Sequence, residues 1–382
     1  MRGVYCVALW IFTMFAVAPA WAQRPPETHP VSDTRNIALS FDRSAPPGDL
    51  QLWGRRTILG HSADESLGYG RIHLTCTSAS SADRGRCPTV GIPDEGVGEG
   101  GSTIPLSFTE RRSGLKVELN VTGSHERISS SRSCFGDFWM VDQRPLWYSA
   151  GGWCVVTDPP VGTGAQLMLA ANELDRLVAG RWDAQLELHL RADPAGPVLA
   201  TYTFTFELSV TDHDRVSIYF PQYDQATPHV GLNVKYNPVS TPSLSGRRDL
   251  DMCLYDGLGS QSPYLEISVT DTGRPAPGRP PERFSVWNAA AIGSDERDRL
   301  DYTVTLRHAG VPIQMQNGRL EPLNGIDSAE LRLVVLPGMS LPVYCVPTPL
   351  TLEVPRVDAS SKTEGYYQGN LTIVLNVPTG TP

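Results

Sequence analysis

Alternation of apolar and polar residues recurs along this chain and predicts a protein built from β-strands. The clearest case is residues 202–210, where every second side chain is apolar and every intervening one is polar. A period of two places alternate side chains on opposite faces of a sheet, so one face of each such strand meets a core. Five further segments alternate in the same way: 115–119, 186–190, 302–306, 331–335 and 350–354.

The last strand predicted by this pattern has no partner in the sequence that follows it. Leu371, Ile373, Leu375 and Val377 fall on one face, and only the short, proline-rich segment 378–382 comes after them. A further strand cannot form there. The terminal strand therefore has either a partner earlier in the chain or an open edge, and an open apolar edge is a hazard unless something binds it.

Turn-rich connections between short strands favour two β-sandwiches. Residues 91–101 and 271–281 are expected to be long exposed loops, and one helix is expected, with Asn172 as its N-cap, 173–179 as its body and Gly180 as its stop. About 360 residues after the leader are too many for one core. The polar stop at 211–214, between two apolar runs, is the expected boundary; because it is so short, we expect the domains to stand end to end within a narrow range of angles.

The amino terminus resembles a secretory signal. Arg2 precedes an apolar run at 7–18, and Ala20-Trp21-Ala22 supplies a small-x-small cleavage site. The run is shorter than the roughly 20 residues that a membrane-spanning helix needs. We therefore expect residues 1–22 to be removed and the remainder to be exported.

Cysteine usage agrees with export. Cys6 leaves with the signal, and an even set remains. Disulfides are expected for an exported chain, and the spacing favours sequential pairing, although other connectivities are possible. The expected pairs are Cys76–Cys87, Cys134–Cys154 and Cys253–Cys345. No CxxC pair occurs and the histidines are scattered, so no metal site is predicted.

Charge and motifs exclude several classes of function. The net charge of −9 argues against a nucleic-acid partner. No GxSxG, HExxH or phosphate-binding glycine loop is present, so we expect neither an enzyme nor a cofactor. Asp249 and Asp251 are spaced to share a strand face as glycosidase carboxylates might, and His213-Asp214 is a lone pair; a structural role is favoured for both.

Arginine doublets are the main candidates for contact with a ligand. Arg55-Arg56 and Arg111-Arg112, together with Arg127 and Arg132, could hold the carboxylate of a sialic acid or another anionic receptor through paired hydrogen bonds. At any single position a surface arginine without a specific role remains the simpler interpretation. The aromatic residues near Cys134 and Cys154 could stack on a sugar, although a core role is the more common one: Phe135, Phe138, Trp139, Trp147 and Trp153.

Five segments, in order along the chain, resemble the pilus tip adhesin family typified by CfaE and CblD. They are 172–182 (NELDRLVAGRW), 200–204 (ATYTF), 218–221 (IYFP), 250–257 (LDMCLYDG) and 365–372 (GYYQGNLT). The resemblance extends from about residue 147 to the end and is loose before that. It implies two tandem immunoglobulin-like β-sandwiches: a receptor-binding domain at 23–211 and a pilin domain at 212–382.

In this family the pilin sandwich lacks its last strand, and a strand from a periplasmic chaperone, later from the major pilin subunit, completes it. The resemblance thus implies a chaperone, an outer-membrane usher and a major pilin as partners, with a host-surface glycan or glycoprotein as receptor, and export through the periplasm to the fimbrial tip. The donor-strand groove would have one wall at Leu371, Ile373, Leu375 and Val377. Its other wall would lie at Val216, Ile218 and Phe220.

Receptor contact is expected from arginines and one aromatic residue of the N-terminal domain: Arg55, Arg56, Arg111, Arg112, Arg132 and Trp139. Two alternatives remain open. A structural initiator of the fimbria would lack receptor binding, and a secreted carbohydrate-active enzyme would need carboxylates that converge in a cleft.

Overall fold

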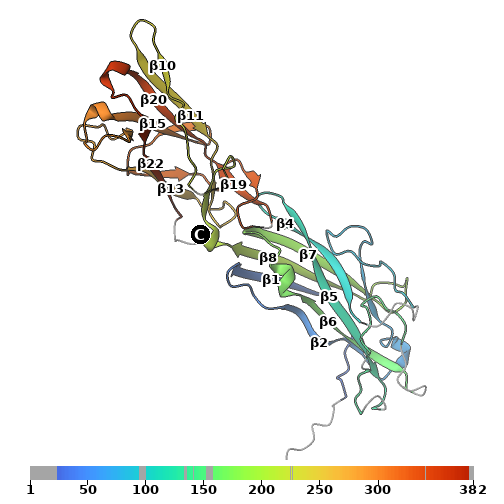
Figure 1. Cartoon of the computed structure of the whole chain (residues 1–382). Helices are drawn as coiled ribbons and strands as arrows, with labels where there is room; N and C mark the ends of the chain where they lie inside the picture. Colours follow the sequence, from blue (N-terminus) through green and yellow to red (C-terminus); the bar gives the residue numbers. More distant parts are fainter. Residues whose placement is uncertain are drawn as a thin grey trace, which may run out of the picture.

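The computed structural model describes residues 24–93, 100–132, 136–140, 142–151, 158–223, 225, 227–339 and 341–377. Two β-rich domains follow one another along an elongated molecule (Figure 1). The proposed signal at 1–22, the tail at 378–382 and the cysteines at 134 and 154 lie outside the described residues. No helix in the described part of the chain is long and apolar enough to span a bilayer.

The N-terminal domain contains one hydrogen-bonded sheet, in the order β1-β8-β7-β4-β5-β6-β2, with β3 added beside β7. The strands are β1 (Asp33–Asp42), β2 (Leu50–His61), β3 (His73–Cys76), β4 (Ser102–Glu110), β5 (Lys116–Ser129), β6 (Pro160–Leu169), β7 (Gly180–Arg191) and β8 (Ala200–Thr211). The alternation at 202–210 is confirmed in β8, whose even positions are buried. β1 joins β8 in parallel, unlike the other pairs.

This sheet folds back on itself into two layers around a core. Trp53 of β2 lies edge-on to Tyr202 and Phe204 of β8, with ring centroids 5.0 and 5.2 Å apart, although β2 and β8 are far apart in the strand order. Phe108 of β4 packs on Phe206 of β8. Fully buried aromatic side chains of this size supply much of the hydrophobic stabilisation of a domain.

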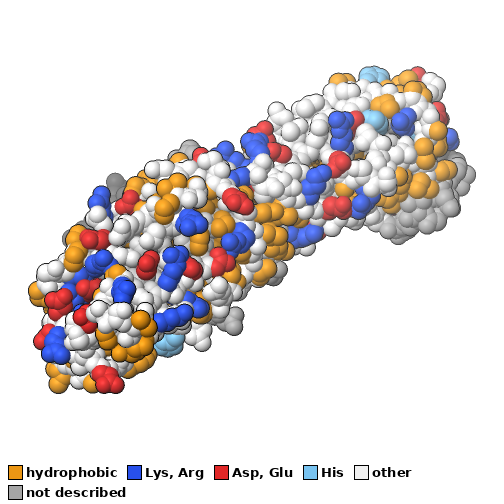
Figure 2. Space-filling view, turned by 90° about the horizontal axis from the view of Figure 1, so that it is seen from above, with side chains coloured by type: hydrophobic (Ala, Val, Ile, Leu, Met, Phe, Trp, Pro, Cys, Tyr) orange, Lys and Arg blue, Asp and Glu red, His pale blue; other side chains and the backbone are white. Residues whose placement is uncertain are grey.

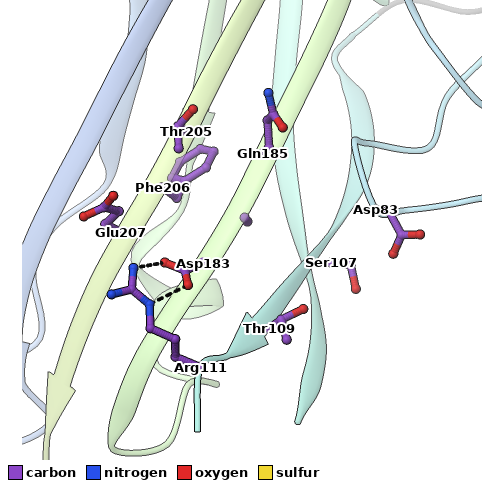
Figure 3. A pocket seen from close by; sticks show the side chains of 10 residues that line it. Asp83, Ser107, Thr109, Arg111, Asp183, Gln185, Thr205, Phe206 and Glu207 are labelled. Atoms are coloured by element: carbon purple, nitrogen blue, oxygen red, sulfur yellow. Dashed lines mark hydrogen bonds and ion pairs between the residues drawn. The ribbon is translucent and has the colours of Figure 1, made fainter. Parts of the chain in front are cut away.

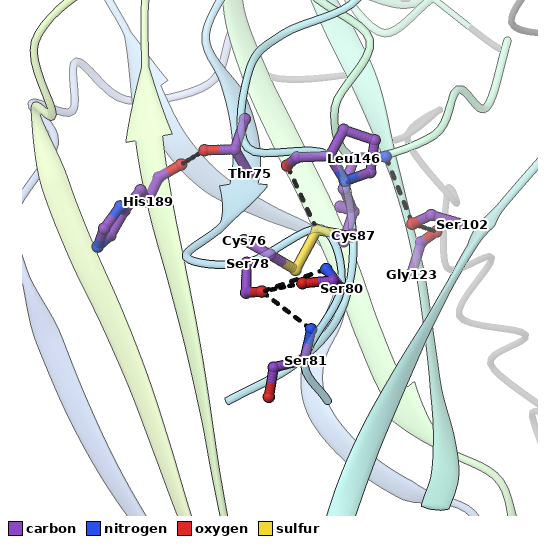
Figure 4. The surroundings of a disulfide bond; sticks show 11 residues. Thr75, Cys76, Ser78, Ser80, Ser81, Cys87, Ser102, Gly123, Leu146 and His189 are labelled. Atoms are coloured by element: carbon purple, nitrogen blue, oxygen red, sulfur yellow. Dashed lines mark hydrogen bonds between the residues drawn. A yellow bond between two sulfur atoms is a disulfide. The ribbon is translucent and has the colours of Figure 1, made fainter. Parts of the chain in front are cut away.

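A disulfide between Cys76 and Cys87 ties the end of β3 to the loop that follows it, as the sequence predicts (Figure 4). Within that loop Ser78 Oγ accepts hydrogen bonds from the backbone N–H groups of Ser80 and Ser81. The side chains of Cys76 and Cys87 are buried in the core of the N-terminal domain.

The expected helix is shorter than the sequence suggests. α1 spans only Ala171–Leu174, and Ala170, not Asn172, is its N-cap residue. The carboxylate of Glu173 accepts hydrogen bonds from the backbone N–H and the side-chain amide of Asn120 on β5. Tertiary contacts of this kind override the weak helical preference of a short segment, because an isolated turn is not stable by itself. Residues 175–179 then lead directly into β7.

The C-terminal domain consists of three smaller sheets: β10-β11-β20-β15-β14-β21 with β16 beside β15, β18-β19-β12-β9, and β17-β13-β22. The strands are β9 (Ser217–Tyr219), β10 (Lys235–Asn237), β11 (Ser243–Leu250), β12 (Cys253–Tyr255), β13 (Tyr264–Thr272), β14 (Phe284–Asn288), β15 (Arg299–His308), β16 (Val311–Gln314), β17 (Leu320–Asn324), β18 (Arg332–Val334), β19 (Val343–Pro347), β20 (Leu350–Asp358), β21 (Tyr367–Gln368) and β22 (Asn370–Asn376). The short 3-10 turns are η1 (Glu65–Leu67), η3 (His213–Arg215), η4 (Glu296–Asp298) and η5 (Ala359–Ser361).

A second predicted disulfide is confirmed between Cys253 of β12 and Cys345 of β19. Both cysteines are fully buried. The alternating apolar residues of β13, β15 and β20 form the core beside them, and these inward-facing side chains are 5% exposed or less. The period-two pattern therefore places the core of this domain correctly.

The two domains meet without a flexible linker. β8 ends at Thr211, β9 begins at Ser217, and the turn η3 lies between them. The N–H of Asp212 donates to the carbonyl of Gly257 over 2.7 Å. The buried cluster of the N-terminal domain continues into the C-terminal domain through Tyr255 and Val343.

Candidate functional site

The terminal strand β22 has one paired edge and one edge without a strand partner in the described part of the chain. It pairs antiparallel with β13, so that Ile373 lies opposite Val269 and Leu375 opposite Ile267. β22 ends the order of its sheet. Unpaired backbone N–H and C=O groups along such an edge are a template for another strand.

The apolar face of β22 is only half covered. Leu371, Ile373, Leu375 and Val377 contact the C-terminal core but remain partly exposed. Ile267, opposite Leu375 on β13, is fully buried. The expected alternation is thus present, and the side chains of β22 are left at the rim of the core instead of inside it.

A second set of partly buried apolar residues contacts the same core from the start of the domain. Ile218 on β9 and Phe220 just after it belong to this set. Val216 instead lies at the domain junction, where its Cγ2 is 3.4 Å from a Cβ built on Gly257. Val230 and Leu232 contact the same core and were not predicted from the sequence. Their spacing of two residues was the available signal.

At the other end of the molecule, Arg55 and Arg56 of β2 share one buried carboxylate. Each donates through Nε to Glu126 of β5 over 2.8 Å, and Arg56 also reaches Asp137 over 3.2 Å. The Glu126 side chain is 4% exposed, whereas that of Arg55 is 55% exposed. Glu126 therefore orients both guanidinium groups and offsets part of their charge. The hydrogen bond that Arg55 donates to Glu126 also raises the pKa of Arg55, which favours its charged form.

Aromatic rings lie among these arginines. The guanidinium of Arg56 is 5.0 Å from the ring centroid of Trp139, and those of Arg24 and Arg132 lie 5.7 and 5.4 Å from the ring of Phe138. Such contacts favour a cation over the face of a ring. Phe138 and Trp139 are each 9% exposed, so they act as supports for the arginines more than as open stacking surfaces. We call Arg55, Arg56, Arg132 and Trp139 the polar-tip cluster.

The other aromatic candidates are divided. Trp147 packs against the core of the N-terminal domain, whereas Phe135 and Trp153 lie outside the described residues. Arg127, which the sequence grouped with the surface arginines, is wholly inside the domain. Its guanidinium donates to the carbonyls of Ile72, Tyr148 and Ala150 and to Thr163 Oγ1.

Arg111 and Arg112, which the sequence also suggested as receptor contacts, are not part of the polar-tip cluster. They lie in the turn before β5, while Glu126 lies about 30 Å further along that strand at 3.4 Å per residue. Arg112 donates to the carbonyls of Ile326 and Ala329 in the C-terminal domain. It therefore holds the two domains together.

Arg111 is engaged by a carboxylate on the outer face of the sheet. Two bonds of 2.7 Å join its guanidinium to Asp183, beside a shallow hollow of about 470 Å³ (Figure 3). Ser107, Thr109, Gln185 and Thr205 also line this hollow with polar side chains, and Phe206 forms part of its wall. The hollow is open, and its lining contains no cluster of converging buried polar groups.

The candidate catalytic groups do not converge. Asp249 binds Arg247 and Thr351, whereas Asp251 binds Arg332, so each carboxylate has its own partners. His213 binds Asp42 of β1 through Nδ1 over 2.7 Å and not the neighbouring Asp214. Acidic and basic side chains are interspersed over both domains in the view of Figure 2. The contacts of Asp249 with Arg247 and of Asp251 with Arg332 are ion pairs, whereas those of Thr351 and His213 are hydrogen bonds.

Comparison with known proteins identifies relatives for both halves of the chain. Residues 18–213 match the family model of the first domain of CfaE, a subunit of the CFA/I fimbria, and residues 216–379 match that of its second domain. The CFA/I fimbrial protein CfaE of Escherichia coli is 27% identical over 312 residues, which are 80% of each chain.

Solved structures agree. The crystal structure of CfaE, the adhesive subunit of the CFA/I fimbria of enterotoxigenic E. coli, matches with a TM-score of 0.68 and 25% identity over 94% of this chain and 95% of that one. A structure described as a chaperone–tip adhesin complex of CFA/I fimbriae has the same fold, with a TM-score of 0.64 and 24% identity, covering 94% and 99% of the two chains. Because the two family models together span nearly the whole chain, this protein belongs to the CfaE family of fimbrial proteins.

Proposed function

We propose that this protein is a minor fimbrial subunit at the tip of a chaperone–usher fimbria, where it attaches to a host receptor and joins the shaft by accepting a donated strand. The observation that carries the proposal is β22, which has no strand partner on its outer edge among the described residues and an apolar face that is only half covered. Membership of the fimbrial family supports the same function.

The groove has the chemistry that a donated strand requires. One flank is β22, with Leu371, Ile373, Leu375 and Val377; Ile218 and Phe220 belong to the other. A strand laid along β22 would form backbone hydrogen bonds with its free edge and insert alternate apolar side chains between the flanks. We propose a periplasmic chaperone as the first donor, the major pilin as the second, and the outer-membrane usher as the site of exchange.

A chaperone as partner has support from a relative of the same fold, whose structure is described as a chaperone–tip adhesin complex. The pathway would carry the mature chain through the periplasm to the cell surface. The domain bounds 23–211 and 212–382 remain part of this proposal, with the receptor-binding domain first and the pilin domain second.

For receptor contact we propose the polar-tip cluster, with a glycan or glycoprotein that carries an acidic group as the ligand. Arg55 is the more exposed of its doublet, and its Nε is occupied by Glu126, which leaves its terminal nitrogens as donors. A guanidinium held in this way recognises a planar carboxylate with little loss of side-chain entropy.

The strand proposal is tested by thermal unfolding of the mature chain with and without a synthetic peptide from the N-terminal extension of the major pilin. We expect the peptide to raise the melting temperature, since it binds only the folded state. Ile373→Asp/Leu375→Asp should remove the response by placing charges on the flank. A control peptide with its apolar residues changed to Asp should have no effect. If the native peptide does not raise the melting temperature, the sandwich is complete and the strand proposal is wrong.

The receptor proposal is tested by cell attachment and a glycan array. Arg55→Gln/Arg56→Gln should weaken attachment, with a loss of about 2–5 kcal/mol if a desolvated charge pair is truncated. Arg111→Gln is the matched control, because Arg111 is also exposed and paired with a carboxylate but lies outside the cluster. Equal attachment by both variants and the wild type would point to another surface or to an initiator subunit without receptor binding.

A further inference from the structure

The ends of the proposed groove are not equivalent. β9 leaves the domain junction, because Ser217 follows the interdomain turn η3. β22 returns toward the junction, since it runs antiparallel to β13, which leads away from it (Figure 1). The N-terminal domain occupies that end of the groove. A subunit that donates its own N-terminal extension is therefore expected to place its folded body at the opposite end, which we call the base of the C-terminal domain.

Both flanks of the groove lead to exposed apolar side chains at the base. The segment with Val230 and Leu232 continues into β10, which pairs with the first residues of β11 to form a projecting hairpin (Figure 1). On this hairpin Tyr236 is 60% and Val239 68% exposed. On the other flank Tyr366, four residues before β22, is 73% exposed.

The hairpin is anchored at its foot by contacts with the segment that ends β20. The N–H of Ala359 donates to the carbonyl of Pro242 over 2.9 Å, and Arg356 Nε donates to Ser243 Oγ over 3.0 Å. Large apolar side chains that are exposed on a projecting hairpin have no role in the core of their own domain. Such side chains at the end of a domain are candidates for a contact with another protein.

We propose that the β10–β11 hairpin, with Tyr236 and Val239 at its centre and Tyr366 beside the groove, is a docking surface for the folded body of the subunit that donates the strand. The inference rests on the proposed donor-strand function and adds a second contact to it. Strand and docking surface would then act as two linked sites, so that the complex separates only when both are released. The partner surface should be apolar and lie where its N-terminal extension leaves its fold.

The test separates the two contacts by using two probes on the full mature chain. The probes are the synthetic extension peptide and the whole major pilin with its extension intact, and the measured quantity is the rate at which each bound probe is displaced by excess peptide. The hairpin variant is Tyr236→Asp/Val239→Asp. The matched control is Val31→Asp in the N-terminal domain, where the valine is 71% exposed.

We expect the peptide to leave all three proteins at the same rate, and the whole pilin to leave the hairpin variant about tenfold faster, as for loss of a contact residue worth over 1 kcal/mol. Equal release of the whole pilin from the hairpin variant, the control and the wild type would overturn the docking surface while leaving the strand proposal intact. Failure of both probes to bind the wild type would refute the proposed function, and the docking surface with it.

Discussion

Burial of basic groups is the most consequential feature at the scale of single residues. Arg127 is completely enclosed, its four hydrogen-bond acceptors are carbonyls and a hydroxyl, and burial lowers its pKa to about 9. His125 is also buried on β5, stacked on Tyr148, and neither of its ring nitrogens has a hydrogen-bond partner of good geometry among the described residues. These two basic side chains are thus buried without a carboxylate partner among the described residues.

Acid should therefore destabilise the N-terminal domain. Burial, followed by the charges of Arg127, His73 and Arg144, lowers the pKa of His125 well below its ordinary value, and burial also lowers that of His73. A lowered histidine pKa means that the unfolded chain binds more protons than the folded one below about pH 6.5. The free energy of unfolding should fall by up to about 1.4 kcal/mol per pH unit for each such histidine.

Urea unfolding between pH 7.5 and 5 measures this slope. We expect His125→Gln to flatten it, whatever its effect on stability at neutral pH, because one titrating group is removed. His229→Gln, at an exposed position, should leave the slope unchanged. An equal slope in all three proteins would show that His125 does not titrate against folding.

The contacts of single residues also distinguish candidate arginines that look alike in the sequence. Arg55 and Arg111 both begin a doublet and both end up bound to a carboxylate. What distinguishes them is the position of the strand that carries each partner. Glu126 and Asp137 bring Arg56 to Trp139, and that meeting depends on the register of β2 against β6 and β5, not on any local pattern.

At the scale of elements, the strands follow from alternation because burial on one face of a sheet needs only a period of two. The last strand was predicted at 371–377 and is observed as Asn370–Asn376. α1 shows the opposite behaviour. The helix is shorter than predicted. Asn120 donates a hydrogen bond to Glu173, and Leu174 is buried in the core; neither relation can be inferred from a helical pattern in the sequence.

The disulfide between β12 and β19 closes a longer loop than the disulfide between Cys76 and Cys87. Its removal should therefore cost more stability. Its cysteines are 92 residues apart, and both are fully buried. Cys253→Ala/Cys345→Ala should therefore cost about 2–5 kcal/mol. Cys76→Ala/Cys87→Ala, with a sequence separation of 11 between the cysteines, should cost less. Differential scanning calorimetry checks this order, and a greater loss from the shorter loop would contradict it.

At the scale of the whole molecule, the junction behaves as packed interior. Gly257 and Gly259 both have φ of +69°, and a Cβ on them would lie 2.4 Å from the carbonyl oxygen of Asp212 and 2.7 Å from that of Ala179. Side chains are excluded at both positions, because the backbone of the linker approaches Gly257 and that of the N-terminal domain approaches Gly259. With only a 3-10 turn as linker, the two domains should keep one relative orientation.

Arg112 gives a direct test of this rigidity. Its bonds to the carbonyls of Ile326 and Ala329 cross the junction, and hydrogen bonds to a charged group contribute about 1.5–3 kcal/mol each. Arg112→Ala should widen the distribution of interdomain distances in small-angle X-ray scattering and speed proteolysis near His213. Arg111→Ala, which removes a pair within one domain, should change neither. If Arg112→Ala matches the wild type, the apolar contacts alone hold the domains.

The sequence by itself determined the fold class, the core faces of the strands and two of the disulfides, because alternation and cysteine spacing are local and survive in any arrangement of the strands. It also predicted the strand at 371–377, which is observed as β22, because that segment alternates strictly between apolar and polar residues. Only the tertiary structure decided which arginines meet, that Val230 and Leu232 contact the C-terminal core while Val216 lies at the junction, and that Arg112 binds the other domain. Those relations depend on side chains brought together from distant strands, and their contacts leave no trace in the local order of residues.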